Sequence, residues 1–157
     1  MKEVKAFSFY QLNIEKFIYT SVKINTLPKK HIVDRYLETV RSFGVEDDGL
    51  GLDYFIPGTD KIKRDDIPNA HQRGYIGIVI GAALGTKKLP LHKLKELCAV
   101  VDHPIILLGG KEDYENGKQI AAVDEIKIYN ACGKFNLNES ADLVRNAKLI
   151  VSHDTGL

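Results

Sequence analysis

The sequence predicts an α/β fold, in which a parallel β-sheet carries helices on both of its faces. From residue 75 onward, short apolar runs alternate with segments whose apolar residues recur every three or four positions, the spacing of a helix face. The apolar runs contain few polar residues, as expected for strands that are covered on both faces. Short links join the two kinds of segment, and this alternation is typical of parallel strands connected by right-handed crossovers.

The first part of the chain has a weaker pattern, which predicts a strand, two helices and a long loop. The run KAFSFY suggests a short strand over Lys5–Tyr10, and the mainly apolar stretch Ile14–Val22 suggests a helix. Lys29–Phe43 carries one apolar stripe at helical spacing, so a second helix is expected there. Glu46–Gln72 is polar and interrupted by Gly and Pro, which predicts a linker with a short extended piece around Leu52–Ile56.

The second part of the chain is predicted to contain strands and helices in strict alternation. Pro90 suits the first turn of the helix after the first strand. The expected strands are Ile76–Ala83, Ile105–Leu108, Lys127–Ala131 and Leu149–Ser152, and the two later helices are Asp113–Val123 and Glu139–Ala147.

Composition excludes several classes of function. The formal net charge is only +1, so no overall field attracts nucleic acid. No apolar run is long enough to span a membrane, and the first residues do not form a signal peptide. Cys98 and Cys132 are far apart and lack metal-ligand spacing, so we interpret them as reduced core thiols. The five histidines are also scattered, and no metal site is expected.

The loops that follow the predicted strands should meet at one edge of the sheet, where α/β proteins bind ligands. Thr86 and Lys87 follow a glycine in the first of these loops and could hold a phosphate. Glu115, in the second, could bond a ribose hydroxyl, and Thr155 and Gly156 offer phosphate donors in the last. An ordinary strand-end turn remains an alternative for the last loop. The G-x-G-x-x-G, P-loop and G-x-S-x-G motifs are absent.

Four stretches of the second part stand out in order along the chain. They are GAALGTKKLP, LLGGKEDYENG, GKFNLNESADLVRNAKLIV and DTGL. Together they resemble the carboxyl-terminal domain of the family 9 glycosyltransferases, the ADP-heptose:lipopolysaccharide heptosyltransferases. Lys87 falls on the Lys of the family's K-x-W-P segment, where Leu89 replaces the Trp, and Glu115 falls on an acidic position. The segment His31 to Phe55 is similar to the family's interdomain segment.

The resemblance implies the Rossmann-like C-terminal half of a GT-B fold. Residues 1–72 would be the end of an N-terminal domain and an interdomain segment, and residues 73–157 a donor-binding domain truncated at its end. Lys87 and the loop Asp154-Thr155-Gly156 would hold the donor diphosphate, close enough together to share one anion. Glu115 would lie at the ribose, and the backbone near Phe135 at the adenine. The catalytic residues stay unknown, because the family's general base belongs to the N-terminal domain.

By this resemblance, the chain is expected to be part of a metal-independent transferase without a cofactor. The whole enzyme would move a sugar from an ADP-sugar to a lipopolysaccharide-core or other glycan acceptor, with inversion. It would act in the cytoplasm, at the inner face of the inner membrane, and contact the membrane only through the acceptor. The isolated chain is expected to be inactive and to self-associate. The alternatives are a non-catalytic nucleotide-binding module and another GT-B nucleotide-sugar enzyme such as an epimerase.

Overall fold

The computed structural model of the chain describes residues 6–153 and Thr155. The chain divides into two compact units, Met1–Asp53 and Tyr54–Leu157. Each unit is described by itself below.

The first unit is helical and has no buried residue in its helices. It contains α1 (Asn13–Val22) and α2 (Ile32–Leu37), followed by a single 3₁₀ turn, η1 (Arg41–Phe43). Both predicted helices are therefore present, but the second is much shorter than Lys29–Phe43. The helix ends early because Thr39 is β-branched and its hydroxyl bonds the Tyr36 carbonyl, which competes with a continued helix.

The predicted strand at Lys5–Tyr10 is wrong, since residues 6–10 form no strand. The aromatic residues of this run make local side-chain contacts instead. The Phe9 ring packs edge-on against Tyr36, with ring centroids 4.4 Å apart, and the Arg35 guanidinium lies over its face. The Phe9 side chain thus packs against α2.

The start of the second unit is a chain of turns tied to the sheet. The extended piece expected at Leu52–Ile56 is not a strand. Asp142 accepts a hydrogen bond from the Ile62 N–H at 2.9 Å, and the buried His71 Nε2 lies 3.0 Å from the carbonyls of both Ile105 and Lys127. The predicted division at residue 72 concerns the domains of a whole family member and stays a prediction. The turns themselves are η2 (Gly58–Asp60), η3 (Arg64–Asp66) and η4 (Asn69–His71).

A parallel sheet forms the centre of the second unit, as the sequence predicted. Among the described residues it has four strands in the order β3-β2-β1-β4, and every neighbouring pair is parallel. The first strand is shorter than expected, because β2 ends at Leu108 and no neighbouring strand pairs with Gly81 to Ala83. The strands are β1 (Ile76–Val79), β2 (Ile105–Leu108), β3 (Ile128–Asn130) and β4 (Leu149–Val151).

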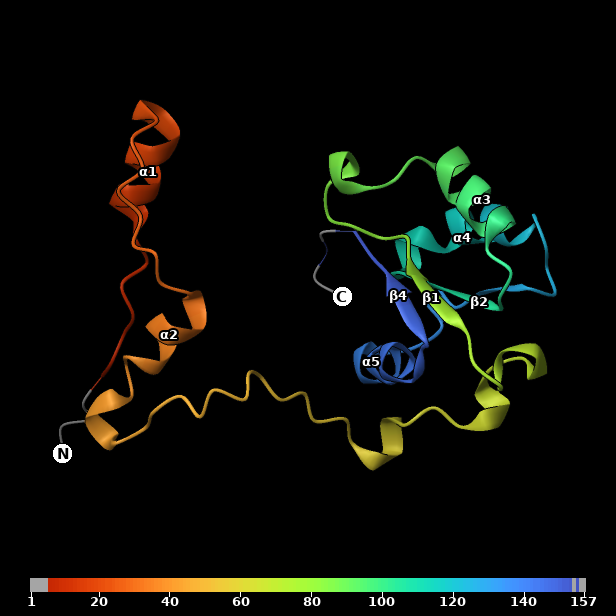
Figure 1. Cartoon of the computed structure of the whole chain (residues 1–157), viewed down its shortest axis with the longest axis horizontal. Helices are drawn as coiled ribbons and strands as arrows, with labels where there is room; N and C mark the ends of the chain where they lie inside the picture. The colour runs from red at the N-terminus through yellow and green to blue at the C-terminus, as the bar shows by residue number, and fades with distance from the viewer. Residues whose placement is uncertain (1–5, 154, 156–157) are drawn as a thin grey trace. The chain divides into compact units, whose positions relative to one another are not determined.

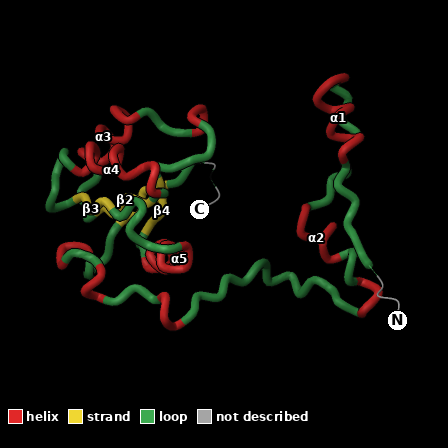
Figure 2. The backbone as a smooth tube through the Cα atoms, turned by 180° about the vertical axis from the view of Figure 1, so that it is seen from behind, coloured by secondary structure: helices red, strands yellow, loops and turns green. Residues whose placement is uncertain are grey.

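Helices cover both faces of this sheet. The helices α3 (Leu91–Val100) and α4 (Tyr114–Ala121) lie on one face, and α5 (Leu137–Asn146) lies on the other (Figure 1). Figure 2 shows the same two layers from behind. The two faces carry separate apolar clusters, one around Leu94, Cys98 and Ile120 and one around Leu143. The alternation of strand and helix in the sequence therefore gives the predicted architecture.

The two cysteines are free and fully buried, which confirms that they are core thiols. Burial raises the pKa of Cys98 to about 11, and burial together with the charge of Asp113 raises the pKa of Cys132 to about 12. Burial also raises the pKa of Tyr75 to about 12. Each group is protonated in both states at neutral pH, but above pH ~9 the unfolded thiols ionise first.

We therefore expect the free energy of unfolding to fall as the pH rises from about 9 to about 12, because the unfolded state loses protons that the folded state keeps. Urea unfolding at a series of pH values measures this slope. A Cys98→Ala variant should show a shallower slope over the same range. Equal slopes for the variant and the parent chain would contradict this assignment.

Candidate functional site

The loops that leave the carboxyl ends of the four strands meet at one edge of the sheet, because all the strands are parallel. The strand order reverses between β1 and β4. The chain leaves β1 toward α3 on one face, whereas it reaches β4 from α5 on the other face (Figure 1). Such a reversal point leaves a crevice at the carboxyl edge, the usual place for a ligand in an open α/β sheet.

An open hollow of about 310 Å³ lies at this edge. Two glycine-containing loops form most of its wall, Gly81 to Ala83 after β1 and Gly109 to Asp113 after β2. Thr155, from the loop after β4, completes the lining. The structure thus brings Thr155, the predicted phosphate-binding threonine, to the loops after β1 and β2. In the sequence, Thr155 lies more than 70 residues after the first of these loops.

The other predicted site residues lie on the same loops but outside the lining of this hollow. Thr86 and Lys87 are exposed in a 3₁₀ turn, η5 (Gly85–Lys87), and Glu115 is exposed in the first turn of α4. Phe135 is half-buried against the apolar cluster on the α5 face. Their contacts with a donor, and the shared anion between Lys87 and Thr155, remain predictions. Asp154 and Gly156 lie outside the described residues.

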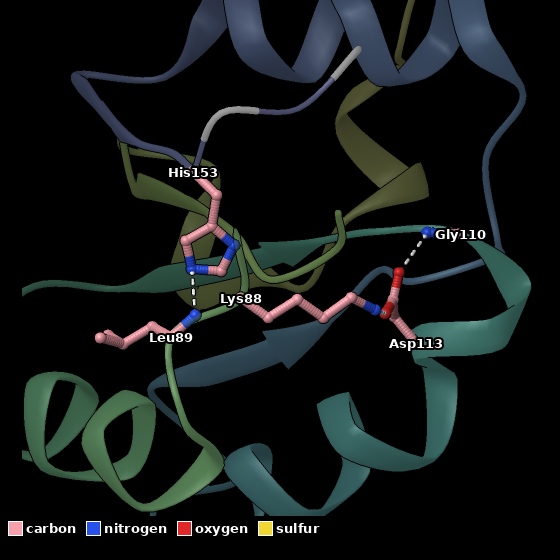
Figure 3. A network of polar contacts seen from close by, with 5 residues as sticks. All are labelled: Lys88, Leu89, Gly110, Asp113 and His153. Atoms are coloured by element: carbon pink, nitrogen blue, oxygen red, sulfur yellow. Dashed lines mark hydrogen bonds and ion pairs between the residues drawn. The ribbon is translucent and has the colours of Figure 1, made fainter. Parts of the chain in front are cut away.

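A half-buried ion pair that the sequence did not predict joins the first two loops. The Nζ of Lys88 lies 2.7 Å from Oδ1 of Asp113, and Oδ2 of Asp113 accepts the Gly110 N–H at 3.1 Å (Figure 3). The Asp113 side chain is only 3% exposed, whereas Lys88 is 29% exposed. A buried carboxylate needs such partners, because it would otherwise lose its hydration without compensation.

Two glycines make room for this carboxylate. A Cβ added to Gly81 would lie 2.4 Å from Oδ2 of Asp113, and one added to Gly109 would lie 3.0 Å from the Asp113 Cβ. The group that approaches these two glycines is thus an acidic side chain of the protein itself.

A second contact joins the first loop to the loop after β4. The Leu89 N–H donates to Nε2 of His153 at 3.0 Å (Figure 3). An accepting Nε2 places the proton of the neutral imidazole on Nδ1, which is buried and has no hydrogen-bond partner among the described residues. Lys88 therefore ties the loop after β1 to the loop after β2, and Leu89 ties it to the loop after β4. Both contacts directly follow Lys87 in the sequence.

The sequence held only weak signals for these contacts. Asp113 stands three residues after Gly110 at the start of a helix, a spacing at which an acid bonds a free backbone N–H. Nothing in the local pattern distinguishes Lys88 from Lys87, and no local pattern links His153 to Leu89.

The charges around the hollow are mixed. Lys87 and Lys88 lie on the loop after β1, and Glu112, Asp113 and Glu115 lie on or after the loop after β2. In the part of the chain that the structure describes, no three His, Cys, Asp or Glu side chains gather in a way that could hold a metal ion. Cationic side chains and backbone N–H groups are the anion-binding groups that this edge offers.

Comparison with known proteins identifies the architecture. Residues 14–157 match glycosyltransferase family 9, described as heptosyltransferase. The chain belongs to glycosyltransferase family 9. A curated relative, lipooligosaccharide heptosyltransferase 2 of Haemophilus influenzae, is 34% identical over 94 residues, which make up 55% of this chain and 27% of the relative. The predicted resemblance to this family is thus confirmed.

Solved structures of the family show the same fold. The chain matches E. coli ADP-heptose LPS heptosyltransferase II with a TM-score of 0.60 and 20% identity, over 80% of this chain and 43% of that one. For a family 9 glycosyltransferase of Veillonella parvula, the TM-score is 0.66 and the identity 23%, over 82% of this chain and 39% of that one. For E. coli heptosyltransferase WaaC with ADP, the TM-score is 0.58 and the identity 24%, over 83% of this chain and 41% of that one.

The α/β fold with a parallel sheet, as found in GT-B heptosyltransferases, is therefore confirmed. The chain spans less than half the length of each of these relatives. In its described residues, no helix combines the length and apolarity that crossing a membrane requires.

Proposed function

We propose that this chain is the donor-binding part of a heptosyltransferase-like glycosyltransferase and that it binds an ADP-sugar at the carboxyl edge of its sheet. The observation that carries the proposal is the position of Thr155, which lines one hollow together with the glycine loops after β1 and β2. The hollow lies at the reversal point of the strand order, and the chain belongs to a family whose solved members include one bound to ADP.

Each residue at this edge has a proposed role. Thr86, Lys87 and Thr155 donate hydrogen bonds to the diphosphate, and Lys87 adds a positive charge. Glu115 accepts a bond from the ribose, and the backbone near Phe135 borders the adenine. Asp154 and Gly156, which are not described, would complete the phosphate loop.

The reaction of the whole enzyme would need neither a metal nor a cofactor. An acceptor hydroxyl attacks the anomeric carbon, the bond to the ADP oxygen breaks, and the configuration inverts. Hydrogen-bond donors and Lys87 stabilise the negative charge that develops on the departing diphosphate. The acceptor would be a lipopolysaccharide core or another glycan at the cytoplasmic face of the inner membrane. The general base would come from the part of the family fold that this chain does not span.

A panel of nucleotides tests the proposal. Isothermal titration of the chain with ADP, UDP and GDP should show binding of ADP and at least tenfold weaker binding of the others, an order-of-magnitude expectation for a pocket that recognises adenine through hydrogen bonds. Equal binding of all the nucleotides would favour a general nucleotide-binding module, and preferred binding of UDP would favour another GT-B enzyme such as an epimerase. If no nucleotide binds, the proposal is wrong.

We also propose that the 157-residue chain alone binds the donor without transferring sugar and that it self-associates. It spans less than half of its relatives, and holding two substrates together accounts for several orders of magnitude in rate, about 7–11 kcal/mol. The strand β4 is at the edge of the described sheet, with Leu149 56% and Val151 36% exposed.

An assay of ADP release from ADP-heptose with a core acceptor, together with size-exclusion chromatography, tests both proposals. We expect no turnover and an elution volume that depends on concentration. Turnover at the rate of a full-length family member would contradict the first proposal, and a monomer at every concentration would contradict the second.

A further inference from the structure

Asp113 is an acidic side chain at the centre of an edge that is proposed to bind an anion. It is buried, yet it belongs to the lining of the hollow, and its two oxygens are used by Lys88 and by the Gly110 N–H. A negative charge beside a diphosphate weakens diphosphate binding by electrostatic repulsion. We therefore expect another function of this carboxylate in the site. Its contacts indicate what that function is.

The contacts of Asp113 reach the loops after both β1 and β2. Within its own loop, it fixes the Gly110 amide. It also holds the ammonium of Lys88 on the loop after β1 (Figure 3). Lys88 directly follows the turn that carries Thr86 and Lys87, so this contact fixes the end of that turn. The absence of a side chain on Gly81 allows the carboxylate to reach this position, because a Cβ there would lie 2.4 Å from Oδ2.

We infer that Asp113 is a positioning residue of the donor site, which acts through Lys88 to hold the turn Gly85–Lys87 in the conformation that receives the diphosphate. This inference rests on the proposed function. Lys88 is the fixed point of the turn, and Lys87, its neighbour, is the phosphate-binding lysine. When the turn adopts its binding conformation for only a fraction of the time, the apparent affinity falls by that fraction.

The opposite role for this ion pair makes a different prediction. If Lys88 itself bound the diphosphate, Asp113 would compete with the ligand for its ammonium. Removing the charge of Asp113 would then release Lys88 and tighten ADP binding. Positioning through Lys88 instead requires that removal of the charge weakens ADP binding.

The test is an NMR-monitored titration of the 157-residue chain and of its Asp113→Asn variant, once with ADP and once with adenosine. We expect the Kd for ADP to rise about tenfold, the effect of a turn that is competent about a tenth of the time. The Kd for adenosine, which lacks the diphosphate, should change less than about twofold. The matched control is Asp142→Asn, because Asp142 is also a buried acid, 5% exposed, and bonds the Ile62 N–H away from this edge. It should leave both affinities unchanged.

A variant at the more exposed partner covers the case in which Asp113→Asn does not fold. Lys88→Gln should also weaken ADP binding and spare adenosine, and the double variant should be no weaker than the worse single variant, because both act through one contact. ADP binding that is unchanged or tighter in Asp113→Asn would overturn the inference. Equal losses for ADP and adenosine, or additive losses in the double variant, would overturn it too. Failure of the parent chain to bind ADP would refute the proposed function itself and is visible in its own titration.

Discussion

Replacing Lys87 by alanine is expected to weaken ADP binding by roughly 10- to 150-fold. A charge-assisted hydrogen bond is worth about 1.5–3 kcal/mol, and each 1.4 kcal/mol is a factor of ten in affinity. Lys87 ends the turn Gly85–Lys87, which precedes the ion-paired Lys88 at the edge of the hollow. Isothermal titration of the purified variant with ADP measures the change.

The control for Lys87 is Lys148→Ala, since Lys148 is an exposed lysine just before β4, at the amino edge of the sheet, and its loss changes the net charge by the same amount. The affinity of this control should stay within about twofold of the parent chain, because exposed charges separated by more than a Debye length are largely screened. In 0.15 M salt, equal losses in both variants would show that Lys87 acts only through the overall charge. An unchanged ADP affinity in Lys87→Ala would remove it from the site.

Truncation of Leu107 to alanine should cost the sheet unit about 2–5 kcal/mol of unfolding free energy, the usual range for a buried leucine that leaves a cavity. Leu107 is fully buried in β2 and belongs to the apolar cluster that α3 and α4 cover. Its strand leads directly into the Gly109–Asp113 loop, so its packing also supports the hollow. Urea unfolding followed by circular dichroism measures the loss.

The same substitution at Leu149 is the matched control. Leu149 lies in the edge strand β4 and is 56% exposed, so Leu149→Ala should cost about 1 kcal/mol or less. A similar loss at both positions would mean that β4 is as well covered as β2. That result would contradict the edge position that supports the proposal of self-association.

The sequence predicted the sheet unit well because three of its four strands are largely apolar runs. Such runs are easily recognised when both faces of a strand are covered, and all four predicted strands are found in parallel. The first unit was harder to predict. Its strand at Lys5–Tyr10 is absent, and Lys29–Phe43 is helical only in part. Neither α1 nor α2 has a buried residue, so the apolar pattern of the first unit was a poor guide to its structure.

The candidate site could be predicted only in outline. The topology of a parallel sheet brings the loops together, and Thr155 does line a hollow with the first two. The contacts that hold these loops join residues far apart in sequence, Lys88 with Asp113 and Leu89 with His153. No local pattern encodes such pairs, because each depends on how two loops pack after the sheet has formed.

The most direct test of the proposed site is an NMR titration of the ¹⁵N-labelled chain with ADP. We expect the amide signals of residues 81–89, of residues 109–115 and of Thr155 to shift with one common Kd, because these residues form or adjoin the hollow at the carboxyl edge. Signals from α1, and from the turns around His71 at the opposite edge of the sheet, should stay in place. Shifts confined to α1 or to the turns around His71, or no shifts at millimolar ADP, would contradict the assignment of the donor site.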